Sequence, residues 1–214
     1  MFSDIESEIY VILLASVAII AVLNPFGNLP QFIAMTEGLD ADIRKKLFRN
    51  IIYTAFCIVL VFLLSGPFIM KYLFKIDIND LRVAGGLILI IMSTKNLLFT
   101  PSSTQFQHYQ GLSHKELLKK SIVPMAFPML VGPGTLSTIV VISEDQNLAI
   151  AIASVLLTFA FIFALFHFSA TIEKVIGKLV LYVFSRIALV FIMAMGVKMI
   201  AIGIQTYIQS TWDK

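Results

Sequence analysis

Residues 24–30 read Asn24-Pro25-Phe26-Gly27-Asn28-Leu29-Pro30 and interrupt a hydrophobic segment that otherwise favours one helix from Ile9 to Met35. A proline inside a helix removes a backbone donor and clashes with the preceding turn, which destabilises the helix by roughly 3 kcal/mol. Lipid offers no water to the freed backbone groups, so such a break is tolerated only where it is covered by protein or lines a cavity. The interruption therefore predicts a protein-covered bend or a cavity within a membrane.

A second interruption lies in the other half of the chain, at residues 127–135, which read Phe-Pro-Met-Leu-Val-Gly-Pro-Gly-Thr. Overlaying Gly27 on Gly134 aligns the two interruptions and also pairs Glu37 with Glu144. Two interrupted hydrophobic segments in corresponding positions of two halves are the best sequence indication of a transporter binding site.

The composition indicates an integral membrane protein in a lipid bilayer. The 214 residues are 58% hydrophobic and 14% charged, with a mean hydropathy of +0.92, whereas soluble domains average about 25% charged residues. The net charge of +3 is explained by basic loops on the cytoplasmic side, so we expect no nucleic-acid partner. The first eight residues hold three acids and no Lys or Arg, which argues against a secretory signal and for a permanent first span.

Six hydrophobic segments have the length of about 20 residues that a membrane-spanning helix needs. They are Ile9–Met35 (broken), Ile51–Phe74, Arg82–Phe99, Ser121–Ile142 (broken), Leu148–Ala170 and Ile187–Ile208. Asp40 is a candidate cap for a short amphipathic helix that leads into the second segment. Residues 100–120 read as a flexible connector between two halves, residues 1–99 and 121–214, within one membrane domain.

The two halves predict an inverted duplication. Arg82-Val-Ala84 matches Arg186-Ile-Ala188, in addition to the paired breaks. Each half has three spans, an odd number. The second copy therefore starts on the opposite side of the membrane and has the inverted orientation. We therefore expect an all-α membrane protein of six transmembrane helices, arranged as two inverted three-helix repeats with broken first and fourth helices.

The distribution of basic residues predicts the orientation. With the N-terminus outside, the inner loops and adjoining helix ends hold eleven of the 16 Lys and Arg residues, and the outer side holds four. Because basic residues concentrate on the cytoplasmic side, this bias predicts that both termini lie outside the cytoplasm.

The second break resembles the start of a helix aimed at a ligand. Gly132 can cap the helix, and Pro133 suits its first position, where the missing N–H has no partner to lose. The N–H groups of Gly134, Thr135 and Leu136 then point into the gap at the positive helix end, which is a binding site for a carboxylate. The hydroxyls of Thr135 and Ser137 add further hydrogen-bond donors.

The first break has the same cap-then-proline form at Asn24 and Pro25, and Asn28 overlays Thr135. Carbonyl groups freed by the prolines, with the Asn24 side-chain oxygen, can accept hydrogen bonds from an ammonium group. Gly27 permits close backbone approach, which favours a small ligand. A small zwitterion thus fits between the two breaks. The alternative is that both breaks are bends that serve helix packing, with Asn24 and Asn28 capping helices or bridging them.

Other polar and small residues in the spans predict further features. Lys198 lies within the last span, where an ionisable side chain indicates function; a gating or coupling role, a bond to a freed carbonyl group and a subunit contact all remain open. Gly86 and Gly196 predict close helix contacts. Glu37 and Glu144 end the two half-helices, and we expect each to meet a basic group or water.

The sequence contains few residues that indicate catalysis or metal binding. We find no nucleophile–base pair, metal-ligand cluster or phosphate-binding loop in the sequence, so we expect neither an enzyme nor a cofactor or metal site. No carboxylate lies in the middle of a span, so the coupling ion, proton or sodium, stays open, as does a homo-oligomer.

These motifs resemble the MarC family of six-span inner-membrane proteins. Its pattern has Asn/Asp-Pro-x-Gly-x-x-Pro in the first span and Ala-Gly-Pro-Gly in the fourth, which are residues 24–30 and 131–134 here, with Val131 in place of the usual alanine. Residues 82–86 and 123–128 also look like the family's third-span opening and fourth-span lead-in. The resemblance covers nearly the whole chain, and Leu189 departs from it where glycine is expected.

The resemblance implies a transporter of small neutral amino acids of the glycine, alanine and serine class, in the cytoplasmic (inner) membrane of a prokaryote. It does not imply drug efflux. The alternatives are a transporter of another small solute and a non-transporting scaffold or assembly protein. A selective channel is disfavoured, because the gap has no ring of charges or row of carbonyl groups.

Overall fold

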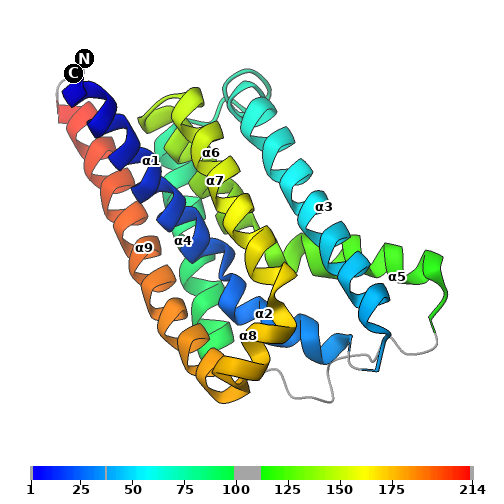
Figure 1. Cartoon of the computed structure of the whole chain (residues 1–214). Helices are drawn as coiled ribbons and strands as arrows, with labels where there is room; N and C mark the ends of the chain where they lie inside the picture. The colour runs from blue at the N-terminus through cyan, green and yellow to red at the C-terminus, as the bar shows by residue number, and fades with distance from the viewer. Residues whose placement is uncertain (1, 37, 99–111, 213–214) are drawn as a thin grey trace.

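The computed structural model describes residues 2–36, 38–98 and 112–212, and all regular structure within these residues is helical (Figure 1). In chain order the elements are α1 (Phe2–Leu23), α2 (Pro25–Met35), α3 (Ala41–Phe68), the π-helical segment η1 (Ile69–Phe74), α4 (Ile78–Leu98), α5 (His114–Lys120), the segment η3 (Ser121–Leu130), α6 (Pro133–Asp145), α7 (Leu148–His167), α8 (Ser169–Ile176) and α9 (Lys178–Trp212). The segment η3 is kinked, because its backbone is extended at Val123 and Phe127. The prediction of an all-α protein is confirmed for these residues. Glu37, Phe99 at the end of the expected third segment, and residues 100–111 of the expected connector lie outside them.

Within the described residues, five helical stretches are long and apolar enough to cross a membrane. They are Ser7–Ile33, Ala41–Leu73, Ile78–Leu98, Leu148–His167 and Leu179–Gln209. A sixth span results if Lys115–Leu130 and Pro133–Asp145, which meet at an angle of 61°, are counted together. Each expected hydrophobic segment coincides with one of these stretches, so the protein is an integral membrane protein with five or six candidate spans.

The helix boundaries differ from the expected ones at three places. The short lead-in helix is not separate, because α3 runs without a break from Ala41, and the Asp40 side chain makes no capping hydrogen bond. The fifth span ends at His167 rather than Ala170, and α8 follows as a separate short helix. The last helix begins at Lys178, well before the expected Ile187, because apolar residues continue toward its N-terminal end.

The half-helix α6 lies at the centre of the bundle, where it contacts α1, α3, α4 and α7. α4 and α9 pack against each other along much of their length. The close approach that Gly86 and Gly196 predict is confirmed, because a Cβ atom on Gly86 would lie 2.5 Å from the Gly196 carbonyl oxygen. This contact holds α4 and α9 together as one wall beside α6.

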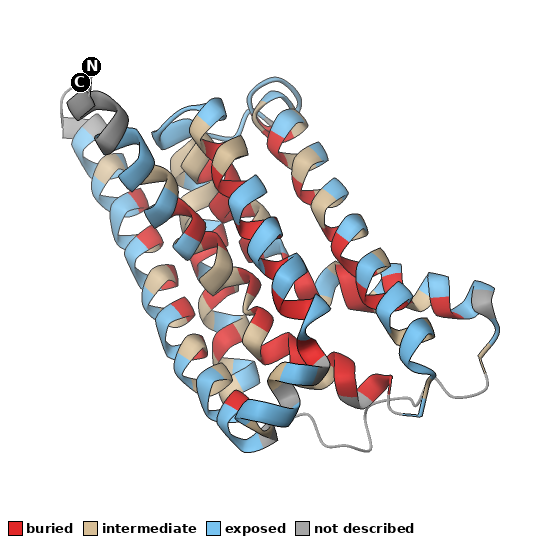
Figure 2. Cartoon of the chain, in the orientation of Figure 1, coloured by how far each residue is buried: buried red, intermediate tan, exposed pale blue. Residues whose placement is uncertain are grey.

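The burial pattern separates a protein-facing from a lipid-facing surface. Figure 2 shows buried residues along the inner faces of the helices and exposed residues along the outer faces. Many exposed side chains are large and apolar, such as Leu64 (59% exposed) and Phe191 (63% exposed). A continuous apolar surface of this kind is suited to lipid rather than water.

Candidate functional site

The first break is a single residue, Asn24, between α1 and α2. Asn24 has a left-handed backbone conformation with φ of 44°, which asparagine adopts more readily than most residues. Its side-chain oxygen accepts a hydrogen bond from the Gly27 N–H at 3.2 Å and so caps α2. The Asn28 side-chain nitrogen donates to the Leu23 carbonyl oxygen at 2.8 Å. The two asparagines therefore satisfy part of the backbone that the break frees.

The second break is wider and bends the chain. Val131 is extended (φ −108°, ψ 99°) and is followed by Gly132 at the N-cap of α6 (φ −93°, ψ 170°), with Pro133 in the first helical position. The Gly132 carbonyl oxygen accepts hydrogen bonds from the N–H groups of Thr135 at 3.0 Å and Leu136 at 3.2 Å. Two of the N–H groups expected to face a ligand are therefore already bonded, whereas Gly134 is too near the helix start to have an intrahelical acceptor.

A pocket lies between the two breaks and brings them together. It holds about 430 Å³ of space that protein atoms do not fill, its open mouth included. The predicted site residues that line it are Asn24, Asn28, Gly132, Gly134 and Thr135. The apolar residues that line it include Leu23, Leu89, Met92, Leu130, Leu189 and Ile192. Residues distant in sequence, from α1, α2, α4, α6 and α9, thus meet around one small space.

The other predicted site residues lie elsewhere. Pro25 is buried within α2, and Gly27 lies directly beneath the Asn24 amide, which a Cβ atom there would overlap. Pro133 is exposed. Ser137 packs against Gly85 of α4, and its hydroxyl donates to the Pro133 carbonyl oxygen at 3.3 Å.

Lys198 does not line the pocket. It is exposed on α9, two residues beyond Gly196, whose backbone faces α4. The structure therefore separates Lys198 from the pocket between the two breaks, and its gating or coupling role stays a prediction.

The sequence interpretation missed Ser93 and Asn96, which line the pocket from α4. The available signal was their spacing, because Leu89, Ser93 and Asn96 recur at intervals of four and three residues and so share one helix face. Polar residues on the inward face of a span indicate a polar cavity.

All side chains that line the pocket are uncharged. Polar contacts are available from three asparagines, Ser93, Thr135 and the backbone at Gly132 and Gly134. Among the described residues, no group of three or more His, Cys, Asp or Glu side chains is placed to hold a metal ion. A site of this kind suits a solute without net charge that carries hydrogen-bonding groups.

The sequence pattern of the MarC family integral membrane proteins matches residues 9–208. The chain belongs to the MarC family. It is 35% identical over 200 residues to the UPF0056 membrane protein YvbG of Bacillus subtilis, covering 88% of this chain and 92% of that protein. A UPF0056 membrane protein of the archaeon Archaeoglobus fulgidus is 28% identical, covering 86% of this chain and 87% of that protein. No solved structure matches the chain.

The two departures from the MarC pattern lie close to the second break and the pocket. Val131, in place of alanine, is fully buried directly before the N-cap of α6. Leu189, in place of glycine, is 4% exposed and lines the pocket from α9. The second departure therefore places a large apolar side chain where it restricts the space available to a solute.

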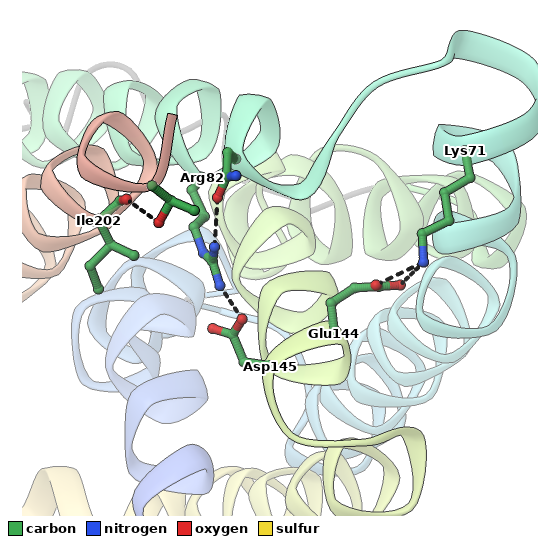
Figure 3. A network of polar contacts seen from close by, with 7 residues as sticks. Lys71, Arg82, Glu144, Asp145 and Ile202 are labelled. Carbon is green, nitrogen blue, oxygen red and sulfur yellow. Dashed lines mark hydrogen bonds and ion pairs between the residues drawn. The ribbon is translucent and has the colours of Figure 1, made fainter. Parts of the chain in front are cut away.

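Two ion pairs connect the C-terminal end of α6 to η1 and to α4 in this MarC protein (Figure 3). Lys71 of η1 donates to both carboxylate oxygens of Glu144, at 2.9 and 3.2 Å. Arg82 of α4 pairs with Asp145 and also donates to the Asn79 side-chain oxygen at 2.7 Å. The expectation that Glu144 meets a basic group is confirmed. Both pairs lie at the end of the bundle that holds the first turns of α1 and the last turns of α9 (Figure 1).

Proposed function

We propose that this MarC protein is a secondary transporter of small neutral amino acids, of the glycine, alanine and serine class. The observation that carries the proposal is that the breaks of the first and fourth segments line one pocket whose side chains are uncharged. A zwitterion has no net charge to neutralise, so it needs opposite dipoles at its two ends rather than a charged side chain. Paired broken helices provide such dipoles.

The proposed binding mode places the carboxylate at the start of α6, near the Gly134 N–H and the Thr135 hydroxyl. Unlike the Thr138 hydroxyl, which donates to the Gly134 carbonyl oxygen at 2.9 Å, the Thr135 hydroxyl donates to no carbonyl group among the described residues. The ammonium group lies near the amide oxygens of Asn24 and Asn28. Leu89 and Leu189 then limit the solute side chain to a small group.

The proposed mechanism is alternating access by two inverted repeats in the cytoplasmic membrane. The ion pairs of Glu144 and Asp145 join α6 to η1 and α4 at the end where the termini lie, whereas Asn96, which lines the pocket, is exposed near the other end of α4. With both termini outside the cytoplasm, this arrangement corresponds to an inward-facing state. Exchanging the conformations of the two repeats would open the pocket to the other side.

A scaffold without transport activity is the second candidate, and one observation favours it. The hydrogen bonds at the first break are internal, since Asn24 caps α2 and Asn28 bonds the Leu23 carbonyl group. These residues therefore have a structural role whether or not they bind a solute.

The test is uptake of labelled glycine and alanine by proteoliposomes, with and without an imposed proton or sodium gradient. Thr135→Val removes a hydroxyl in the pocket, and Thr138→Val is the matched control, because Thr138 lies on the same helix but bonds its own backbone. We expect saturable uptake by the wild type and the control, at least tenfold weaker uptake by Thr135→Val, and stimulation by one of the gradients. Absence of uptake by folded wild-type protein would favour the scaffold.

A further inference from the structure

α4 contributes a buried hydroxyl without a partner to the pocket. Ser93 is 1% exposed, and its hydroxyl oxygen makes no hydrogen bond within the described residues. Most other buried hydroxyls among the described residues donate to backbone carbonyl groups, as serine and threonine in helices commonly do. These include Ser16, Thr36, Ser121, Thr138, Ser154 and Thr158. A buried hydroxyl without a hydrogen bond destabilises the fold. The Ser93 hydroxyl is therefore available to bond a group that the described residues do not provide.

The neighbours of Ser93 place it beside the start of α6. Met92, the preceding residue, lies close to Gly132, since a Cβ atom on Gly132 would lie 3.3 Å from the Met92 methyl carbon. Leu89, one turn earlier on the same face, lies against Gly134, where a Cβ atom would lie 3.0 Å from Leu89 Cγ. All of these residues, with Ser93, line the pocket.

The start of α6 determines which solute group Ser93 meets. A helix N-terminus carries a partial positive charge and unpaired N–H groups, so it attracts an anionic group. A serine hydroxyl either donates or accepts a hydrogen bond, and beside an anionic group it donates. The position of Ser93 therefore matches a carboxylate rather than an ammonium group.

We propose that the Ser93 hydroxyl donates a hydrogen bond to the carboxylate of the amino acid at the start of α6. This inference rests on the proposed transport function and makes a free carboxylate a requirement for recognition. Amides, esters and simple amines of the same size lack the anionic group and bind weakly. The third span thereby joins the first and fourth in forming the site.

The experiment combines thermal unfolding with transport, in the full-length purified protein. Ser93→Ala removes a hydroxyl that has no partner in the fold, so without solute it unfolds at or above the wild-type temperature. Adding free alanine as the solute raises the unfolding temperature of the wild type but not that of Ser93→Ala. The KM of Ser93→Ala for alanine uptake is about tenfold or more above that of the wild type. Ser93→Thr keeps a hydroxyl and retains most of the affinity. The control is Ser65→Ala, because the Ser65 hydroxyl bonds the Val61 carbonyl oxygen on α3, away from the pocket.

A comparison of alanine with alaninamide tests the assignment to the carboxylate. We expect Ser93→Ala to weaken inhibition of uptake by alanine while inhibition by alaninamide stays at its low wild-type level. The inference is overturned if Ser93→Ala is less stable than the wild type without solute, if it keeps the wild-type KM, or if both inhibitors weaken equally. Failure of the proposed function is distinct, because it is read from the wild type alone: no uptake and no stabilisation by any small amino acid.

Discussion

Gly86 of α4 and Gly196 of α9 lie face to face, so that a Cβ atom on Gly196 would lie 2.7 Å from the Gly86 carbonyl oxygen. The reverse contact, at 2.5 Å, is equally close. Backbone atoms cannot rotate away as a side chain can, so any larger residue forces the helices apart. Leu89 of α4 and Leu189 of α9 both line the pocket. The glycine contact therefore holds together the two helices that carry these pocket residues.

Gly86→Ala is expected to destabilise the protein by about 1–3 kcal/mol, because overpacking a well-packed contact displaces backbone. The measurement is the midpoint of unfolding in detergent. Ala84→Val is the control, since Ala84 lies on the same helix but is exposed. Equal midpoints for Gly86→Ala and the wild type would show that α4 and α9 can move apart without loss of stability.

Leu189→Ala is expected to broaden the range of solutes. Leu189 is buried and lines the pocket, and one methylene group in an apolar pocket changes selectivity by roughly 10–200-fold. Uptake of valine relative to alanine should rise at least tenfold, measured by competition in proteoliposomes. Val190→Ala, a change at an exposed neighbour, should leave the ratio unchanged; a similar rise there would contradict a role for Leu189 in the site.

The fold class could be predicted from local sequence signals. Lengths of apolar segments predict spans, and proline and glycine within them predict breaks, because the physical effect of each is local. For this reason Asn24 and Gly132 were predicted correctly as the residues that precede the two half-helices. The start of α3 was misplaced because charged residues before Ile51 continue a helix as readily as they end one.

The pocket lining could be predicted only in part, because the rotation of each helix depends on packing. Ser137 was expected to face the solute but faces Gly85. Lys198 was expected to be functional within its span, and its exposure on α9 could not be predicted from the sequence. Ser93 was missed because a serine in a span ordinarily bonds its own helix. Only the three-dimensional contacts of α4 show that this hydroxyl has no partner among the residues that the structure describes.

Asn24→Ala and Asn24→Gly are expected to differ in stability. Both remove the cap on α2, a loss of about 1 kcal/mol for alanine and a few tenths for glycine. Alanine also resists the left-handed conformation at Asn24, which adds roughly 1–2 kcal/mol. The free energy of unfolding of Asn24→Ala, measured in a detergent titration, should therefore be about 2 kcal/mol lower than that of Asn24→Gly. Equal stabilities would show that the backbone at the first break relaxes to an ordinary conformation.

The ion pairs at the end of α6 are expected to control access rather than stability. Lys71 and Glu144 are partly exposed, with side chains 60% and 24% accessible, and pairs exposed to this degree contribute little to the stability of a fold. Lys71→Gln should therefore leave the unfolding midpoint nearly unchanged. It should nevertheless shift the equilibrium between closed and open states several-fold, because the ratio of two populated states responds strongly to the loss of a contact that only one of them makes.

The shift can be measured by labelling Val141→Cys in a Cys57→Ser background, since Val141 is buried in α6 one turn before Asp145. Lys71→Gln should increase its rate of modification by a membrane-impermeant thiol reagent added on the side of the termini. Exchanging the charges, with Lys71→Glu and Glu144→Lys together, should restore the slow rate, because it restores the attraction. A rate that Lys71→Gln leaves unchanged, or that the exchange fails to restore, would show that this pair does not hold the end of α6 closed.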